Sequence, residues 1–305
     1  MAENVASRAS PVYCSEACQL DTPSMFGTAS QAEVWLLLEY SPPWGAQAFE
    51  ECTLPPAVKE RISAFLRATP NSRLQLIHQD PRRLSSGIAM FLALSREVDP
   101  VLVRVELQSY EDLLDLDLAS LLGNGLRLDG LRGEETVILV CTNARRDRCC
   151  GRLGAPVYRE LSGPESTFVW QTVHVGGHRF AANLVCLPHG IYYGRVEPAR
   201  ARSVVEDFRE GRLALDNFRG RSCYSPVTQA AEGFLRQRSG ERALDAYRLA
   251  GVTQQSSGIV TVEFRARTDG KLERVEVRAA TNRQEKMMGC TPPKWSQPEE
   301  FELVR

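Results

Sequence analysis

The sequence predicts a chain of mixed α/β (α+β) class, organised as three parts over residues 1–130, 131–225 and 226–305. Through the first two parts, short apolar runs that end at Gly, Pro or polar clusters alternate with segments of helical spacing, which is typical of layered α/β domains. From Pro226 the composition changes to a helical stretch followed by alternating strands. At 305 residues and 43% hydrophobic content, the chain is long enough for more than one domain with a full-sized core.

The first part is predicted to be a loop followed by an α/β domain. Residues 1–30 are small and polar and predict loop, whereas the apolar run 34–40, stopped by Ser41 and two prolines, predicts a buried strand. The other expected elements are a helix at 56–69, strands at 74–78, 88–94 and 101–107, an acidic amphipathic helix at 110–122, and a closing glycine-rich stretch at 123–130.

The second part begins with a buried strand at 136–140, which places Cys141 at its carboxyl end. A charged loop, a helix from about residue 152 to 161, a strand at 168–173, a hairpin of 180–187 and 191–196, and a helix at 198–211 are expected to follow. This order of strand, helix, strand, hairpin and helix is compatible with a thioredoxin-like layered domain.

The third part is predicted to be a small extension of one helix and one β-hairpin. The helical stretch runs from Pro226 to about residue 250, and the strands at 259–267 and 272–280 flank a turn at Asp269-Gly270. The tail from Arg283 is polar and contains prolines, so we expect it to be loose. We find no internal repeat in the sequence.

Charge and cysteine content limit the function. The net charge of −1 gives no electrostatic reason to expect a nucleic-acid or membrane partner, and no apolar stretch approaches the ~20 residues of a membrane helix. Residues 1–10 do not resemble a signal peptide, so we expect a soluble, cytoplasmic protein. Nine cysteines, an odd number, then argue against a disulfide framework and favour metal or redox roles.

Four potential metal ligands lie close together in the second part: Cys141, Cys150, His174 and His178, in the pattern Cys-x8-Cys-x23-His-x-Gly-Gly-His. Thiolates and imidazoles suit zinc, copper and iron–sulfur centres. The two glycines of the loop have no side chains, so the backbone can fold tightly and turn both imidazoles toward one site. Adjacent side chains usually point apart, so only one of Cys149 and Cys150 should reach the metal, and spacing alone does not decide which.

An iron–sulfur centre with this ligand set has a distinctive charge. Two ferric ions, two sulfides, two thiolates and two neutral imidazoles sum to zero, whereas four thiolates leave a strongly negative cluster. An electron is added more easily to a neutral centre, so the histidines should raise the reduction potential, as in Rieske centres.

The residues around these ligands resemble the sucrase/ferredoxin-like family. The resemblance is carried by 141–150, by His174-Val-Gly-Gly-His178 with 179–183, and by 187–190 and 193–195; it is strong over 135–200 and weak at 219–226, at 229–232 and near the N-terminus. It implies a thioredoxin-like ferredoxin domain at 131–225 with a [2Fe–2S] cluster, in which Cys141 and Cys150 bind one iron and His174 and His178 bind the reducible iron. It therefore favours Cys150 over Cys149.

The function that this resemblance implies is electron transfer, without substrate turnover, between redox donor and acceptor proteins that the sequence does not identify. Asn143, where many members of the family have His, is a departure that touches no ligand.

Other interpretations remain open. The alternatives are a structural Cys2His2 zinc site and a thiol oxidoreductase that uses Cys149 and Cys150. Cys14 and Cys18 are expected to be loop thiols, and Cys290 to be an ordinary small apolar side chain. The arginines near the ligands form either a solvated face, with Asp147 as an internal partner, or a docking patch for an acidic redox partner; they are Arg145, Arg146, Arg148, Arg152 and Arg179.

Overall fold

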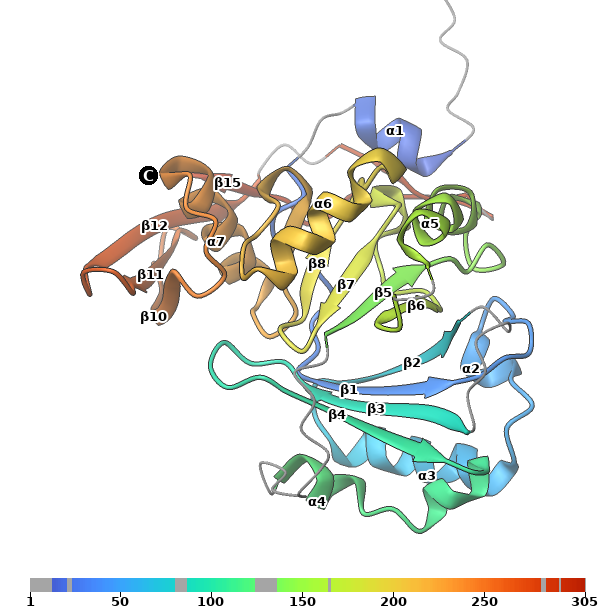
Figure 1. The fold of residues 1–305 in the computed structure, drawn as a ribbon. Helices are drawn as coiled ribbons and strands as arrows, with labels where there is room; N and C mark the ends of the chain where they lie inside the picture. The colour runs from blue at the N-terminus through green and yellow to red at the C-terminus, as the bar shows by residue number, and fades with distance from the viewer. Residues whose placement is uncertain are drawn as a thin grey trace, which may run out of the picture.

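The computed structural model describes residues 13–20, 24–79, 87–123, 136–163, 166–280, 284–290 and 292–304. Within these residues the fold is of the α+β class, as predicted, with helices packed on a large mixed sheet and on a smaller antiparallel sheet (Figure 1). Nearly all of the glycine-rich stretch expected at 123–130 lies outside the described residues.

The largest unit in the described part of the chain is a nine-stranded sheet with the order β4-β3-β1-β2-β6-β5-β7-β8-β9. Its strands are β1 (Val34–Glu39), β2 (Ser72–His78), β3 (Ile88–Leu94), β4 (Val101–Leu107), β5 (Val137–Cys141), β6 (Val169–Thr172), β7 (Leu184–Leu187), β8 (Ile191–Tyr193) and β9 (Phe218–Arg221). The helices associated with it are α2 (Ala48–Glu51), α3 (Pro56–Ala68), α4 (Leu118–Gly123), α5 (Arg148–Leu161) and α6 (Pro198–Arg209), with 3-10 turns η1 (Tyr110–Leu114), η2 (His178–Phe180) and η3 (Leu215–Asn217).

The sheet consists of two halves with the same topology. In the first half β1 and β2 are parallel and connected through α3, while β3 and β4 add antiparallel on the side of β1. In the second half β5 and β6 are parallel and connected through α5, while β7 and β8 add in the same way on the side of β5. The second half, with α6 after it, has the order of strand, helix, strand, hairpin and helix that the sequence predicted; its thioredoxin-like character stays a prediction.

The two halves join through their equivalent edge strands, because β2 pairs antiparallel with β6 at Ile77↔Thr172 and His78↔Gln171. The sequence shows no internal repeat, but the strand topology of the first half is repeated in the second half. The sheet also runs across the predicted boundary at 130/131; the three-part division stays a prediction.

The halves stack on each other and carry their helices on the outside, α3 on one and α5 with α6 on the other (Figure 1). Side chains alternate across each strand. Trp35 and Leu37 of β1 therefore meet Leu139 and Cys141 of β5 in the cluster between the halves. Because both faces of the central strands are buried, these strands appear in the sequence as continuous apolar runs.

The part after β9 forms a helix, α7 (Pro226–Ser239), on a four-stranded sheet of order β10-β11-β12-β15. The strands are β10 (Tyr247–Gln254), β11 (Val260–Ala266), β12 (Leu272–Ala279) and β15 (Phe301–Leu303). The predicted hairpin corresponds to β11 and β12. The predicted helix is too long, because Gly240 ends α7 in a left-handed conformation with φ of 72°.

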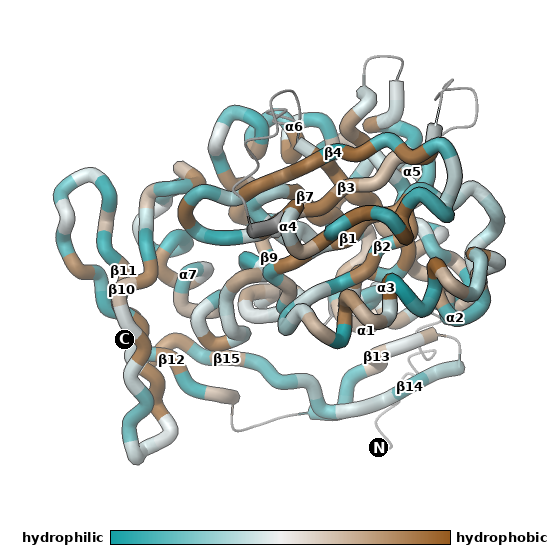
Figure 2. The backbone as a smooth tube through the Cα atoms, turned by 90° about the horizontal axis from the view of Figure 1, so that it is seen from below, coloured by the Kyte–Doolittle hydropathy of each residue, from teal (hydrophilic) through white to brown (hydrophobic). Residues whose placement is uncertain are grey.

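Two predictions at the ends of the chain are wrong. Residues Cys14–Leu20 form a helix, α1, and the tail forms a hairpin of β13 (Lys286–Cys290) and β14 (Pro293–Ser296) as well as β15. Strand β13 packs beside α1, as Figure 2 also shows. Both segments are short, and the contacts that order them come from residues far away in the chain.

Candidate metal centre

The predicted ligands meet at one edge of the second half of the sheet. Cys141 ends β5, and Cys150 lies in the first turn of α5, which begins at Arg148 because Asp147 caps it and accepts the Cys149 N–H at 2.9 Å. His174 follows the parallel neighbour β6, and His178 opens η2. The carboxyl ends of parallel neighbouring strands meet at the same edge of a sheet, and the amino end of α5 lies there too.

Three of the four predicted ligands form a tight group. The ligand atoms of Cys141, Cys150 and His174 all lie within 4.8 Å of one another, and the Cys150 Sγ is 3.7 Å from His174 Nδ1. Both cysteines are buried. His178 is outside this group, but its ring lies beside that of His174, with 5.0 Å between ring centroids.

One ring nitrogen of His178 is hydrogen-bonded, and the other is buried without a partner among the described residues. Its Nε2 contacts the Met288 carbonyl, which can only accept, so Nε2 carries the proton and Nδ1 carries the lone pair. Nδ1 is buried and has no hydrogen-bond partner among the described residues. A buried lone pair without a partner is costly unless it binds something. A carbonyl on the opposite nitrogen is the usual partner of a metal-bound histidine.

The protonation of these groups also suits metal binding. Burial lowers the pKa of His178, so the imidazole is neutral and its 3.8 Å contact with Asp147 is not an ion pair. The Cys150 thiol donates to Cys141 and, together with contacts from His174 and the Val175 N–H, holds the pKa of Cys141 well below its usual value. The same contact and burial raise the pKa of Cys150, so Cys141 is the thiol that ionises more readily. A bound metal would displace the protons of both.

The histidine loop is fixed through its carbonyl groups. Four consecutive carbonyls, those of residues 174–177, accept hydrogen bonds from side chains elsewhere in the fold. The donors are Arg73 to His174 at 3.0 Å, Ser30 and Tyr192 to Val175 at 2.9 and 3.2 Å, Arg219 to Gly176 at 3.2 Å, and Asn183 to Gly177 at 3.0 Å. The Val175 N–H is left to face the Cys141 sulfur.

Gly177 is required in this loop for two reasons. Its φ is 71°, and an added Cβ would lie 2.3 Å from Arg219 Nη2. Arg219 itself is fully buried and also donates to Thr28 Oγ1 at 3.0 Å and to Asn183 Oδ1 at 2.8 Å. Arg219 is not among the site residues predicted from the sequence, where its one signal is its place in the weakly matching segment 219–226.

A second group of cysteines lies next to the first. Cys149 points away from Cys141 and joins Cys14, Cys290 and Asp147, whose ligand atoms all lie within 4.8 Å of one another. The expectation for Cys14 as a loop thiol is therefore wrong, because Cys14 begins α1. Cys290 is buried in an apolar cluster, as expected of a small apolar side chain, but its sulfur also faces that of Cys149. Asp147 and Cys149 are neighbours in the sequence, but no local pattern marks the group, because the three segments that supply it are separated by 133 to 276 residues.

The arginines near the site have different environments. Arg152 pairs with Glu16 at 2.6 Å and lies over the Tyr13 ring, whereas Arg179 is buried and stacks on Phe180. Asp147 accepts backbone N–H groups in the described structure and is not an arginine partner. Arg145, Arg146 and Arg148 are exposed and form a basic patch in the segment between the predicted ligands Cys141 and Cys150.

Comparison with known proteins gives short matches to curated relatives and a long match to one family. The protein named "Altered inheritance of mitochondria protein 32" of Meyerozyma guilliermondii is 30% identical over 97 residues, which cover 28% of this chain and 34% of the relative. The protein of the same name from Candida glabrata is 26% identical over 98 residues, which cover 27% of this chain and 31% of the relative. The matches thus span about a third of each relative. The search of solved structures gave no significant match.

Among the described residues, none of the helices has the length and apolar character needed to cross a bilayer. The family comparison matches residues 25–220, well over half of the chain, to "Sucrase/ferredoxin-like". The chain belongs to the sucrase/ferredoxin-like family.

Proposed function

We propose that the protein is a one-electron carrier that binds a [2Fe–2S] cluster through Cys141, Cys150, His174 and His178. The observation that carries the proposal is the buried Nδ1 of His178, which has no partner among the described residues, on a ring that lies beside His174 of the group with two buried thiols. The cluster, when bound, supplies the site that accepts and releases one electron.

The chain contributes position, charge and exclusion of water. Cys141 and Cys150 are buried, so the thiolate side of the site is closed, whereas the half-buried ring of His174 offers the shorter route to a partner. The Met288 carbonyl keeps the proton of His178 on Nε2. The buried guanidinium of Arg219 sets a positive charge behind the histidine loop, which favours a reduced, negative site.

The redox partners belong to the proposal as well. The exposed arginines at 145, 146 and 148 would attract an acidic redox protein, and we expect neither nucleic acid nor membrane as a partner. Free thiols at all the described cysteines suit a reducing compartment, and we place the protein in the cytoplasm on that basis.

The test is spectroscopic. Protein purified without oxygen should be coloured, contain about two iron atoms per chain, and give an electron paramagnetic resonance signal after reduction with dithionite. His178→Ala should abolish or destabilise the cluster. A colourless protein with zinc bound to Cys141, Cys150 and His174 would instead identify a structural zinc site and overturn the proposal.

The thiol oxidoreductase alternative has less support in the geometry. Cys149 and Cys150 point into different groups and do not face each other as a redox pair. Disulfide reduction that persists in His174→Ala but is lost in Cys149→Ser would favour it over electron transfer.

A further inference from the structure

We propose that Cys14, Cys149 and Cys290, with Asp147, bind a single zinc ion in a second centre, separate from the ligands of the proposed cluster. The three sulfurs come from α1, from the first turn of α5 and from the end of β13. The site would therefore connect both ends of the described chain to the helix that also carries Cys150.

The sulfurs lie close enough together to share one ion, slightly nearer to one another than zinc-bound thiolates would be. Cys149 Sγ lies 3.5 Å from Cys14 Sγ and 3.3 Å from Cys290 Sγ. A tetrahedral zinc ion with bonds of ~2.3 Å holds its sulfur ligands ~3.8 Å apart. A disulfide requires ~2.05 Å, and all three cysteines are free.

Asp147 supplies the fourth position. Its Oδ1 is 3.9 Å from Cys14 Sγ and accepts the Cys149 N–H, while its Oδ2 accepts the Cys290 N–H at 2.8 Å. Each carboxylate oxygen has a second lone pair, so both hydrogen bonds are compatible with binding an ion through Oδ1. The backbone thus fixes the carboxylate in the way that outer partners usually fix a metal ligand.

The ligand set indicates a structural site. All four residues are at most 2% exposed, and the protein supplies every ligand, which is the arrangement of a closed zinc centre. Three thiolates and a carboxylate exceed the charge of zinc. The amino end of the fourteen-residue α5 and the Cys14 N–H, which donates to Cys290 Sγ at 3.1 Å, offset part of this excess.

The surrounding structure explains why an ion is needed there. The apolar cluster at this place has only five buried members, and three of them are these cysteines. The seven-residue α1 and the two-stranded hairpin of β13 and β14 are each too small to be stable alone in water. A zinc ion would supply the stabilisation that apolar packing does not.

The experiment measures metals in the full chain purified without oxygen. We expect about one zinc per chain in addition to iron, and a loss of zinc of roughly tenfold or more in Cys14→Ser and in Cys290→Ser, with iron retained. Cys18→Ser is the matched control, because Cys18 is buried on the same helix but outside the group. Cys141→Ser should lose iron and keep zinc, so this proposal and the cluster proposal fail separately.

A second measurement covers the case in which the serine variants do not fold. Protein with the Cys141→Ser change, produced with cobalt in place of zinc, should show sulfur-to-cobalt charge-transfer bands with the intensity of three thiolates. Zinc absent from the wild-type protein, iron at these cysteines, a disulfide between Cys149 and a neighbour, or an equal loss of zinc in Cys18→Ser would each overturn the proposal.

Discussion

Arg219 has two roles in the structure: it donates hydrogen bonds that fix the histidine loop, and it places a positive charge behind that loop. Replacement by methionine removes both, whereas replacement by lysine keeps the charge. The guanidinium makes four hydrogen bonds, to Thr28 Oγ1, the Thr28 carbonyl, the Gly176 carbonyl and Asn183 Oδ1. Methionine has a similar length and leaves these buried acceptors without their donor, at a cost of ~1–3 kcal/mol for each unsatisfied group.

The net loss of unfolding free energy should be smaller than the sum of the costs for the four acceptors. Arg219 is a fully buried charge without a carboxylate partner among the described residues, and burial lowers its pKa to about 10. Removing it relieves the cost of burying that charge, and water can reach some of the freed acceptors. We therefore expect Arg219→Met to lower the free energy of unfolding by ~2–4 kcal/mol, which is the range for a disrupted buried polar network.

The matched variant is Arg219→Lys, which keeps the positive charge but loses the forked geometry. Urea unfolding followed by circular dichroism measures stability, and visible absorption measures release of the cluster. Both variants should release the cluster at lower urea concentration, whereas only Arg219→Met should shift the reduction potential downward, because it alone removes a positive charge behind the histidine loop. Equal stability and equal potential in the wild type and Arg219→Met would refute the reasoning.

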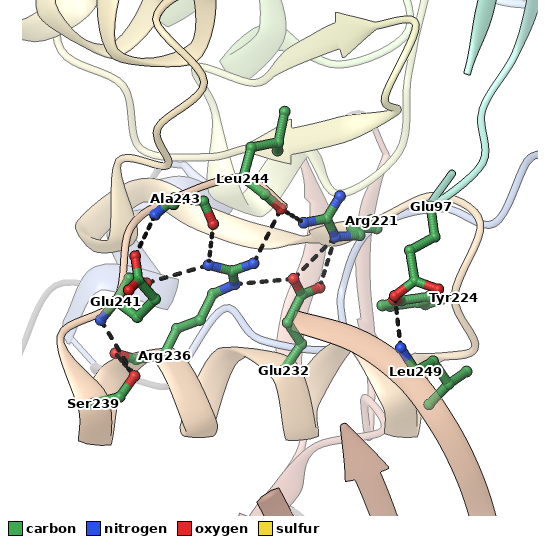
Figure 3. Close-up of polar contacts among 10 residues, drawn as sticks. All are labelled: Glu97, Arg221, Tyr224, Glu232, Arg236, Ser239, Glu241, Ala243, Leu244 and Leu249. Carbon is green, nitrogen blue, oxygen red and sulfur yellow. Dashed lines mark hydrogen bonds and ion pairs between the residues drawn. The ribbon is translucent and has the colours of Figure 1, made fainter. Parts of the chain in front are cut away.

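The remaining predictions concern the ligands, the loop and the C-terminal part. His174→Cys and His178→Cys should each retain a cluster but lower its potential, because a thiolate adds negative charge, and a redox titration showing a higher or unchanged potential would contradict the ligand assignment. Gly177→Ala should weaken cluster binding and lower the free energy of unfolding by ~2–3 kcal/mol in thermal unfolding, because it adds both backbone strain and a clash with Arg219. The control is Gly258→Ala: Gly258 has a φ of 82° with open space around it, so the loss should be only ~1 kcal/mol. Glu232→Gln should cost ~3–5 kcal/mol, because it removes the buried carboxylate that accepts from both Arg221 and Arg236 at 2.9 Å (Figure 3). Burial alone would raise the pKa of Glu232, but the two guanidiniums outweigh it and lower the pKa, so this stabilisation is present above the unfolded pKa of ~4.3 and is lost as pH falls through the folded value. The difference in unfolding free energy between wild type and Glu232→Gln should thus become smaller at acid pH. A difference that stays constant over roughly pH 3 to 7, the range that spans this titration, would contradict the role given to the Glu232 carboxylate.

The sequence predicted those parts of the fold that short-range patterns specify. The apolar run at 34–40 is β1, the helical spacing at 56–69 is α3, and the hairpin around Pro188 is β7 and β8. Cys141 lies at the end of its strand as expected. Each of these depends on a period of two or about 3.6 residues within one segment, which the sequence displays directly.

The features that the sequence did not predict depend on distant partners. Helix α1 and strand β13 owe their order to contacts that join Cys14, Cys149 and Cys290 across most of the chain. The start of α5 at Arg148 was missed because Asp147 was considered as an ion-pair partner of arginine and not as a cap. The repeated topology of the two half-sheets was hidden because the halves share strand order but no visible sequence pattern.

The carbonyl of Met288 on His178 has a practical consequence for dissecting the molecule. A fragment limited to residues 131–225 would contain every predicted cluster ligand and all strands of the second half-sheet, yet it would expose His178 Nε2 to solvent protons. Such a fragment would report the redox chemistry of an altered histidine. The electronic properties of the proposed centre would thus depend in part on Met288, which lies 110 positions downstream of the histidine it contacts.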